Sequence, residues 1–152
     1  VAVAFVDTVG RRPLLLGGVG VMTLSVLTLG FCSETMASGD LAGTSFTARA
    51  SVAAIFAYVG AYQVSFGPIA WLLVGEIFPQ RVRSAAVGTA TLTNFFSNFL
   101  VSLYLPTLNE KFGTAGTYYV FSIMSVIALS SIYLTVPETK GKTLEEIEES
   151  LK

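Results

Sequence analysis

Two asparagines stand in the middle of an apolar stretch, where amide side chains are costly unless they have hydrogen-bond partners. Asn94 and Asn98 are four residues apart, so a helix would place both on one face, with Thr91 one turn earlier. Each amide offers two donors and an acceptor, which suits the hydroxyl groups of a sugar. The pattern therefore has two interpretations: the amides line a hydrated cavity and bind a polar ligand, or they pair with a neighbouring helix.

A second group of polar and aromatic residues surrounds the pair Gly67-Pro68. Proline inside a helix removes a backbone hydrogen bond, so the pair predicts a kink or break in an otherwise apolar segment. Irregular backbone at membrane depth is tolerated chiefly where it is buried or lines a cavity. Trp71, Tyr62 and Gln63 flank the break and could offer aromatic plates and an amide to a sugar ring. Alternatively, Trp71 belongs to the aromatic belt at a membrane interface.

Charged residues gather in short loops between the apolar segments. Asp7, Arg11 and Arg12 lie in one loop, and Glu76 and Arg83 lie in another. Isolated ion pairs on a surface are worth only about 0–1 kcal/mol. If these side chains instead bridge the ends of neighbouring helices, they would form a latch that holds one conformation closed and breaks in the other. The sequence predicts the charges of such a latch and leaves its geometry open.

The composition excludes several kinds of chemistry. The chain has no histidine and its only cysteine is Cys32, which removes disulfide frameworks, Cys/His metal sites and histidine-based catalysis. The cluster Gly17-Gly18-Val-Gly20 follows no strand and lacks the third glycine of a dinucleotide fingerprint. We therefore expect neither an enzyme nor a metal or organic cofactor. The formal net charge of −1 does not suggest a nucleic acid partner.

The elements that would position these residues are membrane-spanning helices. Charged residues make up 12% of the chain and apolar residues 53%, whereas soluble domains are about 25% charged. No charged residue occurs in 13–33, 50–75, 84–109 or 112–137, and each stretch exceeds the roughly 20 residues that a helix needs to cross a bilayer. A charge at the bilayer centre costs about 2.5–3.5 kcal/mol. We predict an all-α, multi-pass integral membrane protein with spans at about 1–6, 14–31, 51–75, 84–108 and 117–136.

The distribution of Lys and Arg predicts the orientation of this bundle. Arg49 and Lys111 fall on one side of the predicted membrane, and six basic residues fall on the other: Arg11, Arg12, Arg81, Arg83, Lys140 and Lys142. The positive-inside rule places the six in the cytoplasm. Residues 1–136 would then be a partial transmembrane bundle and 137–152 a cytoplasmic tail, where a capping box at 143–146 predicts a short helix. The chain lacks an initiator Met and begins inside an apolar run, so we expect a fragment cut within a helix.

Three strings of the sequence resemble the sugar porter family of the major facilitator superfamily: DTVGRR (7–12), GPIAWLLVGEIFPQRVR (67–83) and PETKGKTLEEI (137–147). They occur in the family's order and are separated by the right numbers of predicted spans. The resemblance covers essentially the whole chain, and in detail it is similar to plant and algal xylose–proton-symporter-like members. It implies the major facilitator fold, of which this chain would be the C-terminal part, from the end of helix eight through helix twelve plus the tail.

The resemblance also implies a function. Members have two six-helix halves that rock around a central sugar site, so the whole protein would move a hexose or pentose by alternating access. Proton symport and facilitated diffusion both stay open, and a sugar sensor of the same fold, which binds without transporting, is the alternative. The implied partners are the sugar, the bilayer and the missing N-terminal half. The sequence leaves open which membrane is occupied: plasma membrane, plastid envelope or vacuole.

The resemblance further assigns roles to the residues introduced above. Trp71 would pack on the sugar, and Asn94 and Asn98 would be polar site residues from the eleventh helix. Gln63, beside Tyr62, stands where close relatives often place another polar or acidic contact. The latch that stabilises the outward-open state would be formed by Asp7, Arg11, Arg12, Glu76 and Arg83.

Overall fold

The computed structural model describes residues 9–38 and 44–136, whose regular secondary structure is α-helix. Four helices follow one another: α2 (Arg11–Ala37), α3 (Thr44–Val64), α4 (Phe66–Ile77) and α5 (Arg83–Thr135). The predicted span 1–6 and the predicted tail with its short helix, 137–152, lie outside the described residues. The fold that positions the site is therefore a small all-helical bundle.

The helices satisfy their own hydroxyl groups. In α2, Thr23, Ser25 and Thr28 each donate a hydrogen bond of 2.8 Å to the backbone carbonyl four residues earlier. Thr117 and Ser122 of α5 do the same at 2.9 Å. Because an unpaired hydroxyl is costly in hydrocarbon, these bonds let small polar residues occupy apolar helices.

The long apolar segment that contains Gly67 and Pro68 is divided at Ser65, between α3 and α4. Ser65 has φ −118° and ψ −86°, outside the helical region. Proline acts from a distance here, because its missing N–H would have bonded the carbonyl four residues earlier, Val64, and its ring crowds that same carbonyl. The interruption therefore precedes the proline, and both Gly67 and Pro68 lie in the first turn of α4, where a missing N–H costs little.

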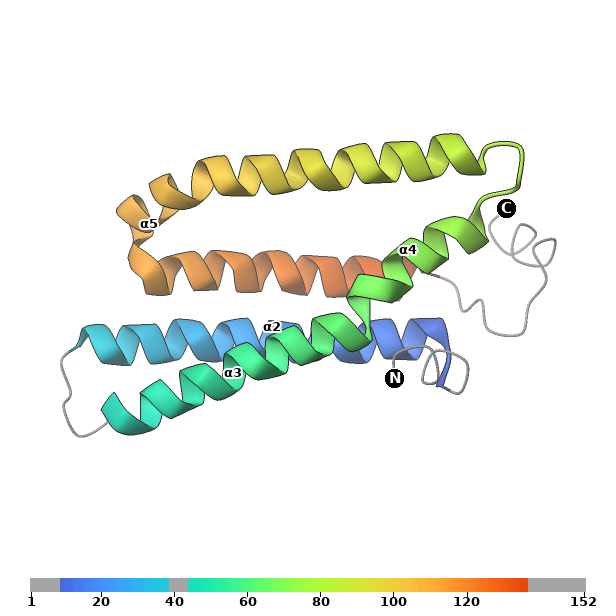
Figure 1. Cartoon of the computed structure of the whole chain (residues 1–152). Coiled ribbons are helices and arrows are strands. Elements are labelled where there is room, and N and C mark those ends of the chain that lie inside the picture. Colours follow the sequence, from blue (N-terminus) through green and yellow to red (C-terminus); the bar gives the residue numbers. More distant parts are fainter. Residues whose placement is uncertain (1–8, 39–43, 137–152) are drawn as a thin grey trace.

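The longest helix, α5, consists of two antiparallel arms joined at Gly113 (Figure 1). We call them the first arm (83–112) and the second arm (114–135). Gly113 has φ 70° and ψ 174°, a conformation that is essentially restricted to glycine. The reversal falls within the connection predicted for 109–116, while the helical backbone runs up to Gly113 on one side and from it on the other.

The helix α2 holds the bundle together, because it packs along α3 on one side and along the second arm of α5 on another (Figure 1). A small core forms where α2 meets α4: Leu15, Ile69 and Leu73 are at most 6% exposed. At the far end of α2, the Tyr119 hydroxyl donates a 2.7 Å hydrogen bond to Glu34 Oε2. The first arm of α5 borders α4 on its outer side.

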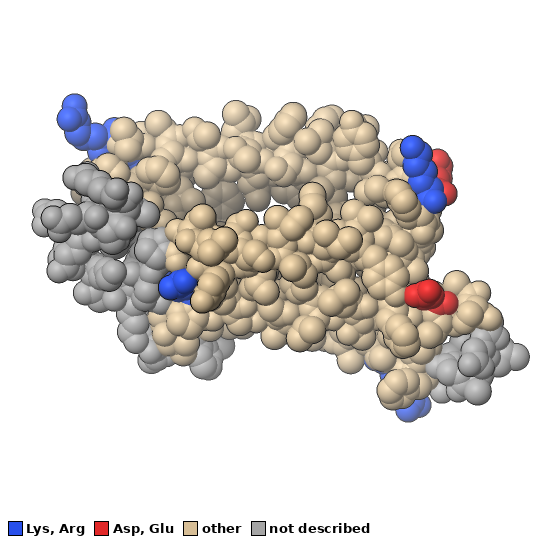
Figure 2. Space-filling model, turned by 180° about the vertical axis from the view of Figure 1, so that it is seen from behind, with Lys and Arg blue, Asp and Glu red and all other residues tan. Residues whose placement is uncertain are grey.

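The dimensions and the surface both suit a bilayer. Three helical stretches are long and apolar enough to cross a membrane: Arg11–Ala37, Phe46–Gly75 and Arg83–Thr135. The second of these runs through the break at Ser65, and the third includes both arms of α5. Figure 2 shows Lys, Arg, Asp and Glu side chains near the two ends of the molecule, separated by a wide band without them on this face. Such a band is what hydrocarbon requires.

Candidate functional site

A small cavity lies where the break between α3 and α4 faces the first arm of α5. Its volume is about 130 Å³. One lining residue comes from α3 and two come from α5, while α4 supplies the others; the full set is Tyr62, Phe66, Gly67, Ala70, Trp71, Val74, Ala90 and Asn94. The structure thus brings together four residues that the sequence predicts for the site or its helix break: Tyr62, Gly67, Trp71 and Asn94.

Helical spacing explains how each wall presents its residues. Gly67, Ala70, Trp71 and Val74 of α4 stand at positions i, i+3, i+4 and i+7, which share one helix face. Four lining residues were not predicted from the sequence: Phe66, Ala70, Val74 and Ala90. Each lies three or four residues from a predicted residue, namely Tyr62, Gly67, Trp71 and Asn94 in that order, so helical periodicity would have found them. Their small or apolar side chains carry no chemical signal of their own.

The amide wall is pre-arranged within the first arm of α5. Asn98 Nδ2 donates to the backbone carbonyl of Asn94 at 2.9 Å and to the Asn94 side-chain oxygen Oδ1 at 3.2 Å. Asn98 does not line the cavity, so its contact with the site runs through Asn94. Asn94 Oδ1 accepts this bond, and an amide has two N–H donors besides, which Asn94 can offer to a ligand in the cavity that it lines.

The aromatic wall bridges the helix break. The rings of Tyr62 and Phe66 lie on either side of Ser65, with their centroids 6.2 Å apart and their planes tilted by 38°. Gly67 allows this approach, because a Cβ atom there would come within 3.1 Å of the Tyr62 carbonyl oxygen and 3.3 Å of its ring. Trp71 is 46% exposed, so much of its indole surface is free to receive an apolar ring face.

Two further residues of the prediction lie apart from the cavity. Gln63 is exposed, and it does not line the cavity. Pro68 is exposed in the first turn of α4, one residue from the cavity wall.

The cavity itself is smaller than the roughly 300–1,000 Å³ of typical small-molecule sites. Residues 9–38 and 44–136 also contain no group of three or more His, Cys, Asp or Glu side chains that could hold a metal ion.

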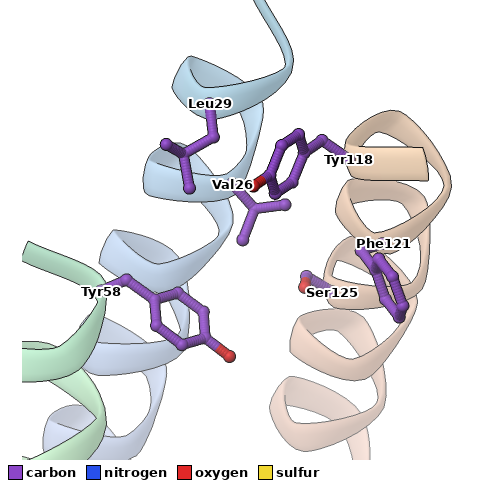
Figure 3. A pocket seen from close by; sticks show the side chains of 6 residues that line it. All are labelled: Val26, Leu29, Tyr58, Tyr118, Phe121 and Ser125. Carbon is purple, nitrogen blue, oxygen red and sulfur yellow. The ribbon is translucent and has the colours of Figure 1, made fainter. Parts of the chain in front are cut away.

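A larger cavity of about 310 Å³ lies elsewhere, between α2, α3 and the second arm of α5 (Figure 3). It is lined by Val26, Leu29, Tyr58, Tyr118, Phe121 and Ser125. Size favours this larger cavity, but chemistry favours the smaller one. In the larger cavity the only polar side-chain groups are hydroxyls, and neither an amide nor the tryptophan lines it. We therefore take the cavity at Trp71 as the candidate site.

The residues predicted for the latch lie at one end of the bundle, as far as they are described. Arg11 and Arg12 begin α2, Glu76 belongs to the last turn of α4, and Arg83 begins α5; Figure 1 shows these helix ends on the same side of the bundle. Asp7 lies outside the described residues.

Arg12 and Arg83 at this end contact other parts of the chain. Arg12 Nη2 donates to the Tyr133 carbonyl at 2.7 Å, and its guanidinium lies 5.4 Å from the centroid of the Tyr133 ring. These contacts tie the start of α2 to the end of α5. Arg83 Nε donates to the Phe78 carbonyl at 3.4 Å, across the loop that joins α4 to α5.

Comparison with known proteins places this arrangement in a family. Residues 1–151 match the family model described as "Sugar (and other) transporter". The chain is 43% identical over 151 residues to the "D-xylose-proton symporter-like 3, chloroplastic" of Arabidopsis thaliana, covering 99% of this chain and 26% of that protein. It is 36% identical over 149 residues to the "Glucose transport protein" of Synechocystis, covering 97% and 32%. The chain thus spans about a quarter to a third of these relatives.

Solved structures agree with the sequence comparison. The inward-open xylose transporter XylE from E. coli superposes with a TM-score of 0.84 at 32% identity, over 99% of this chain and 32% of that one. The helices of this chain therefore match part of the fold of a major facilitator protein. The family match over nearly the whole chain and the membrane-length helices together lead to one conclusion: this chain belongs to the sugar transporter family of the major facilitator superfamily, a family of integral membrane proteins and not of enzymes.

Proposed function

We propose that this chain is the C-terminal part of a transporter that moves a monosaccharide across a membrane by alternating access. The observation that carries the proposal is the single cavity that gathers Tyr62, Trp71 and Asn94 from three different helices. A sugar offers apolar C–H faces and a rim of hydroxyl groups. Aromatic rings suit the faces and an amide suits the hydroxyls.

The named relatives support a sugar as the substrate. They include proteins called D-xylose-proton symporter-like, arabinose-proton symporter and glucose transport protein. One structural match, with a TM-score of 0.83 and 32% identity, is a proton:xylose symporter bound to 6-bromo-6-deoxy-D-glucose. The substrate class that fits this chain is accordingly a pentose or hexose.

The small size of the cavity fits a site that is completed by the rest of a longer polypeptide. A volume of about 130 Å³ is below the usual range for a small-molecule site, and the chain covers only 26–32% of the relatives cited above. We therefore place the remaining sugar contacts on other helices of the same protein. Gln63 is proposed as a contact from the open side of α3, and Asn98 as a support for Asn94.

The proton coupling, if present, would also depend on the rest of the polypeptide. None of the eight residues that line the cavity is acidic, so the coupling carboxylate would come from outside this set. The end of the bundle that carries Arg11, Arg12 and Arg83 is proposed to face the cytoplasm, since basic residues favour that side. There, with Asp7 and Glu76, these arginines would act as the conformational latch.

Uptake of radiolabelled xylose and glucose by the full-length protein, expressed in a host that lacks its own sugar carriers, tests the proposal. We expect saturable uptake that an excess of unlabelled sugar suppresses. A protonophore would lower uptake by a symporter and leave equilibration by a facilitative carrier intact. Saturable binding without any uptake would instead identify the sensor, which is the second candidate function.

A further inference from the structure

The glycine-rich stretch of α2 contributes nothing to the cavity wall, yet one of its glycines is sterically constrained. A Cβ atom added at Gly17 or at Gly20 would meet nothing within 4 Å. A Cβ atom added at Gly18 would collide with both the Cβ and the Oγ atoms of Ser65. Of these three neighbouring glycines, only Gly18 must therefore lack a side chain.

Ser65 is the residue at which α3 gives way to α4, and it is held tightly. It is 2% exposed. Both its backbone N–H and its hydroxyl donate to the Ala61 carbonyl, at 3.0 Å and 2.7 Å. The hydroxyl is thus engaged with the preceding turn and does not cap α4. Since Cβ is fixed to the backbone, rotating the hydroxyl away would not make room for a methyl group on α2.

The position of the break sets the shape of the cavity. Tyr62 lies one turn before Ser65, while Phe66 and Trp71 lie after it, so the walls that they form are joined through Ser65. A Cβ atom at Gly67 would come within 3.1 Å of the Tyr62 carbonyl oxygen, so there is little free space on the cavity side. Any outward shift of Ser65 would therefore change the separation of Tyr62 from α4.

We infer that Gly18 is a positioning residue for the sugar cavity: it admits Ser65 against α2, and this contact fixes the break that places Trp71 opposite Asn94. The inference rests on the proposed function for its sugar readout. Its geometric part is independent of that function: the position of α4 depends on the contact between Gly18 and Ser65.

The test uses the full-length transporter and the variant Gly18→Ala. We expect KM for the transported sugar to rise by about tenfold, because displacements of about 1 Å in a binding site have effects of this order or larger. The amount of protein in the membrane should stay unchanged. Gly17→Ala and Gly20→Ala are matched controls from the same helix, and both should keep the parent KM.

Compensating changes at Ser65 separate positioning from a general loss of packing. Gly18→Ala combined with Ser65→Gly removes both colliding atoms, and its KM should return to that of Ser65→Gly alone. Gly18→Ala combined with Ser65→Ala keeps the Cβ collision, so its KM should stay high. Equal KM values in the two double variants, or an unchanged KM in Gly18→Ala, would overturn the inference.

A second readout needs no sugar. In a full-length background whose own cysteines are replaced, Cys32 included, Ala70→Cys places a thiol on the cavity wall, and its reaction rate with a hydrophilic maleimide reports the position of α4. Gly18→Ala should change this rate, and adding Ser65→Gly should restore it. If the parent protein neither binds nor transports a sugar, the proposed function fails, but the reaction rate of the thiol still tests the role of Gly18. A lower melting temperature with an unchanged rate would reduce Gly18 to a packing residue.

Discussion

At the scale of single residues, the cavity combines aromatic surfaces with one amide whose oxygen already accepts a hydrogen bond. Tyr62 and Trp71 are 41% and 46% exposed, so each keeps a broad apolar face. Asn98 donates to Asn94 Oδ1, and Asn94 retains two N–H donors that can serve a ligand in the cavity that it lines. A ligand that offers apolar faces and hydroxyl acceptors matches both features, as a sugar ring does.

Replacing Trp71 tests the aromatic surface. Trp71→Ala in the full-length protein should weaken sugar affinity by about tenfold, equivalent to ~1.4 kcal/mol, because the indole ring that packs against the sugar face is lost. Trp71→Phe keeps a flat apolar ring and should lose much less. Affinity is measured by equilibrium binding to the purified protein, with membrane yield as the check on insertion. Unchanged affinity in Trp71→Ala would remove this residue from the site.

The link between the two amides makes a second, separate prediction. Asn94→Ala should weaken sugar binding directly, and Asn98→Leu should weaken it less, because Asn98 acts by orienting Asn94. The double variant should be no weaker than Asn94→Ala alone, since the support has nothing left to orient. A thermodynamic cycle of the four affinities measures this coupling. Additive losses would show that Asn98 reaches the sugar independently.

At the scale of elements, single residues determine where helices stop and how far they turn. Pro68 accounts for a break that lies three residues earlier, at Ser65, because it withholds a donor from the carbonyl of Val64. Gly113 reverses α5 with a backbone conformation that other residues rarely adopt. The first arm of α5 is thereby turned back along the second, and its position beside α4 completes the cavity.

The reversal at Gly113 predicts that a substitution there lowers stability through backbone strain and not through a steric clash. Gly113→Ala should destabilise the protein by about 1–3 kcal/mol, because a Cβ atom strains this region of φ/ψ space. No atom lies within 4 Å of the added group, so the cost would be conformational. Gly20→Ala, in open space within α2, is the control and should be neutral or stabilising. Thermal unfolding of the purified full-length protein measures both, and equal midpoints would contradict the argument.

At the scale of the whole molecule, the helix ends that carry Arg11, Arg12 and Arg83 gather at one end of the bundle (Figure 1). Arg12 already links the start of α2 to the end of α5 through Tyr133. Charges at such an end can bias the balance between two conformations, since a contact made in only one state shifts the equilibrium toward that state.

Arg83→Ala tests this bias. If Arg83 belongs to a cytoplasmic latch that holds the outward-open state, its removal should shift the full-length protein toward the inward-open state. A thiol placed in the cytoplasmic half of the pathway would then react several-fold faster with a membrane-impermeant reagent applied from that side, on the order of 1 kcal/mol of bias. Arg83→Lys keeps the charge and should react at a rate closer to that of the parent. Equal rates in Arg83→Ala and the parent would refute the latch.

The sequence by itself determined what depends on neighbours along the chain. Charge-free lengths predict the membrane helices, the spacing of Asn94 and Asn98 predicts their shared face, and Pro68 predicts an irregularity close to where it occurs. The motif strings predict a family that the comparisons show. These features are local because backbone hydrogen bonds, helical periodicity and the cost of a charge in hydrocarbon act over one or a few turns.

Only the tertiary structure decided which distant residues share a site. Trp71 and Asn94 line one cavity because α4 and the first arm of α5 lie side by side, and Ala70 and Ala90 line it too although their side chains carry no chemical signal. Gly18 meets Ser65 because α2 packs against the helix break. The physical reason is that packing matches whole surfaces: a glycine on one helix acquires a role only from the residue that another helix brings to it.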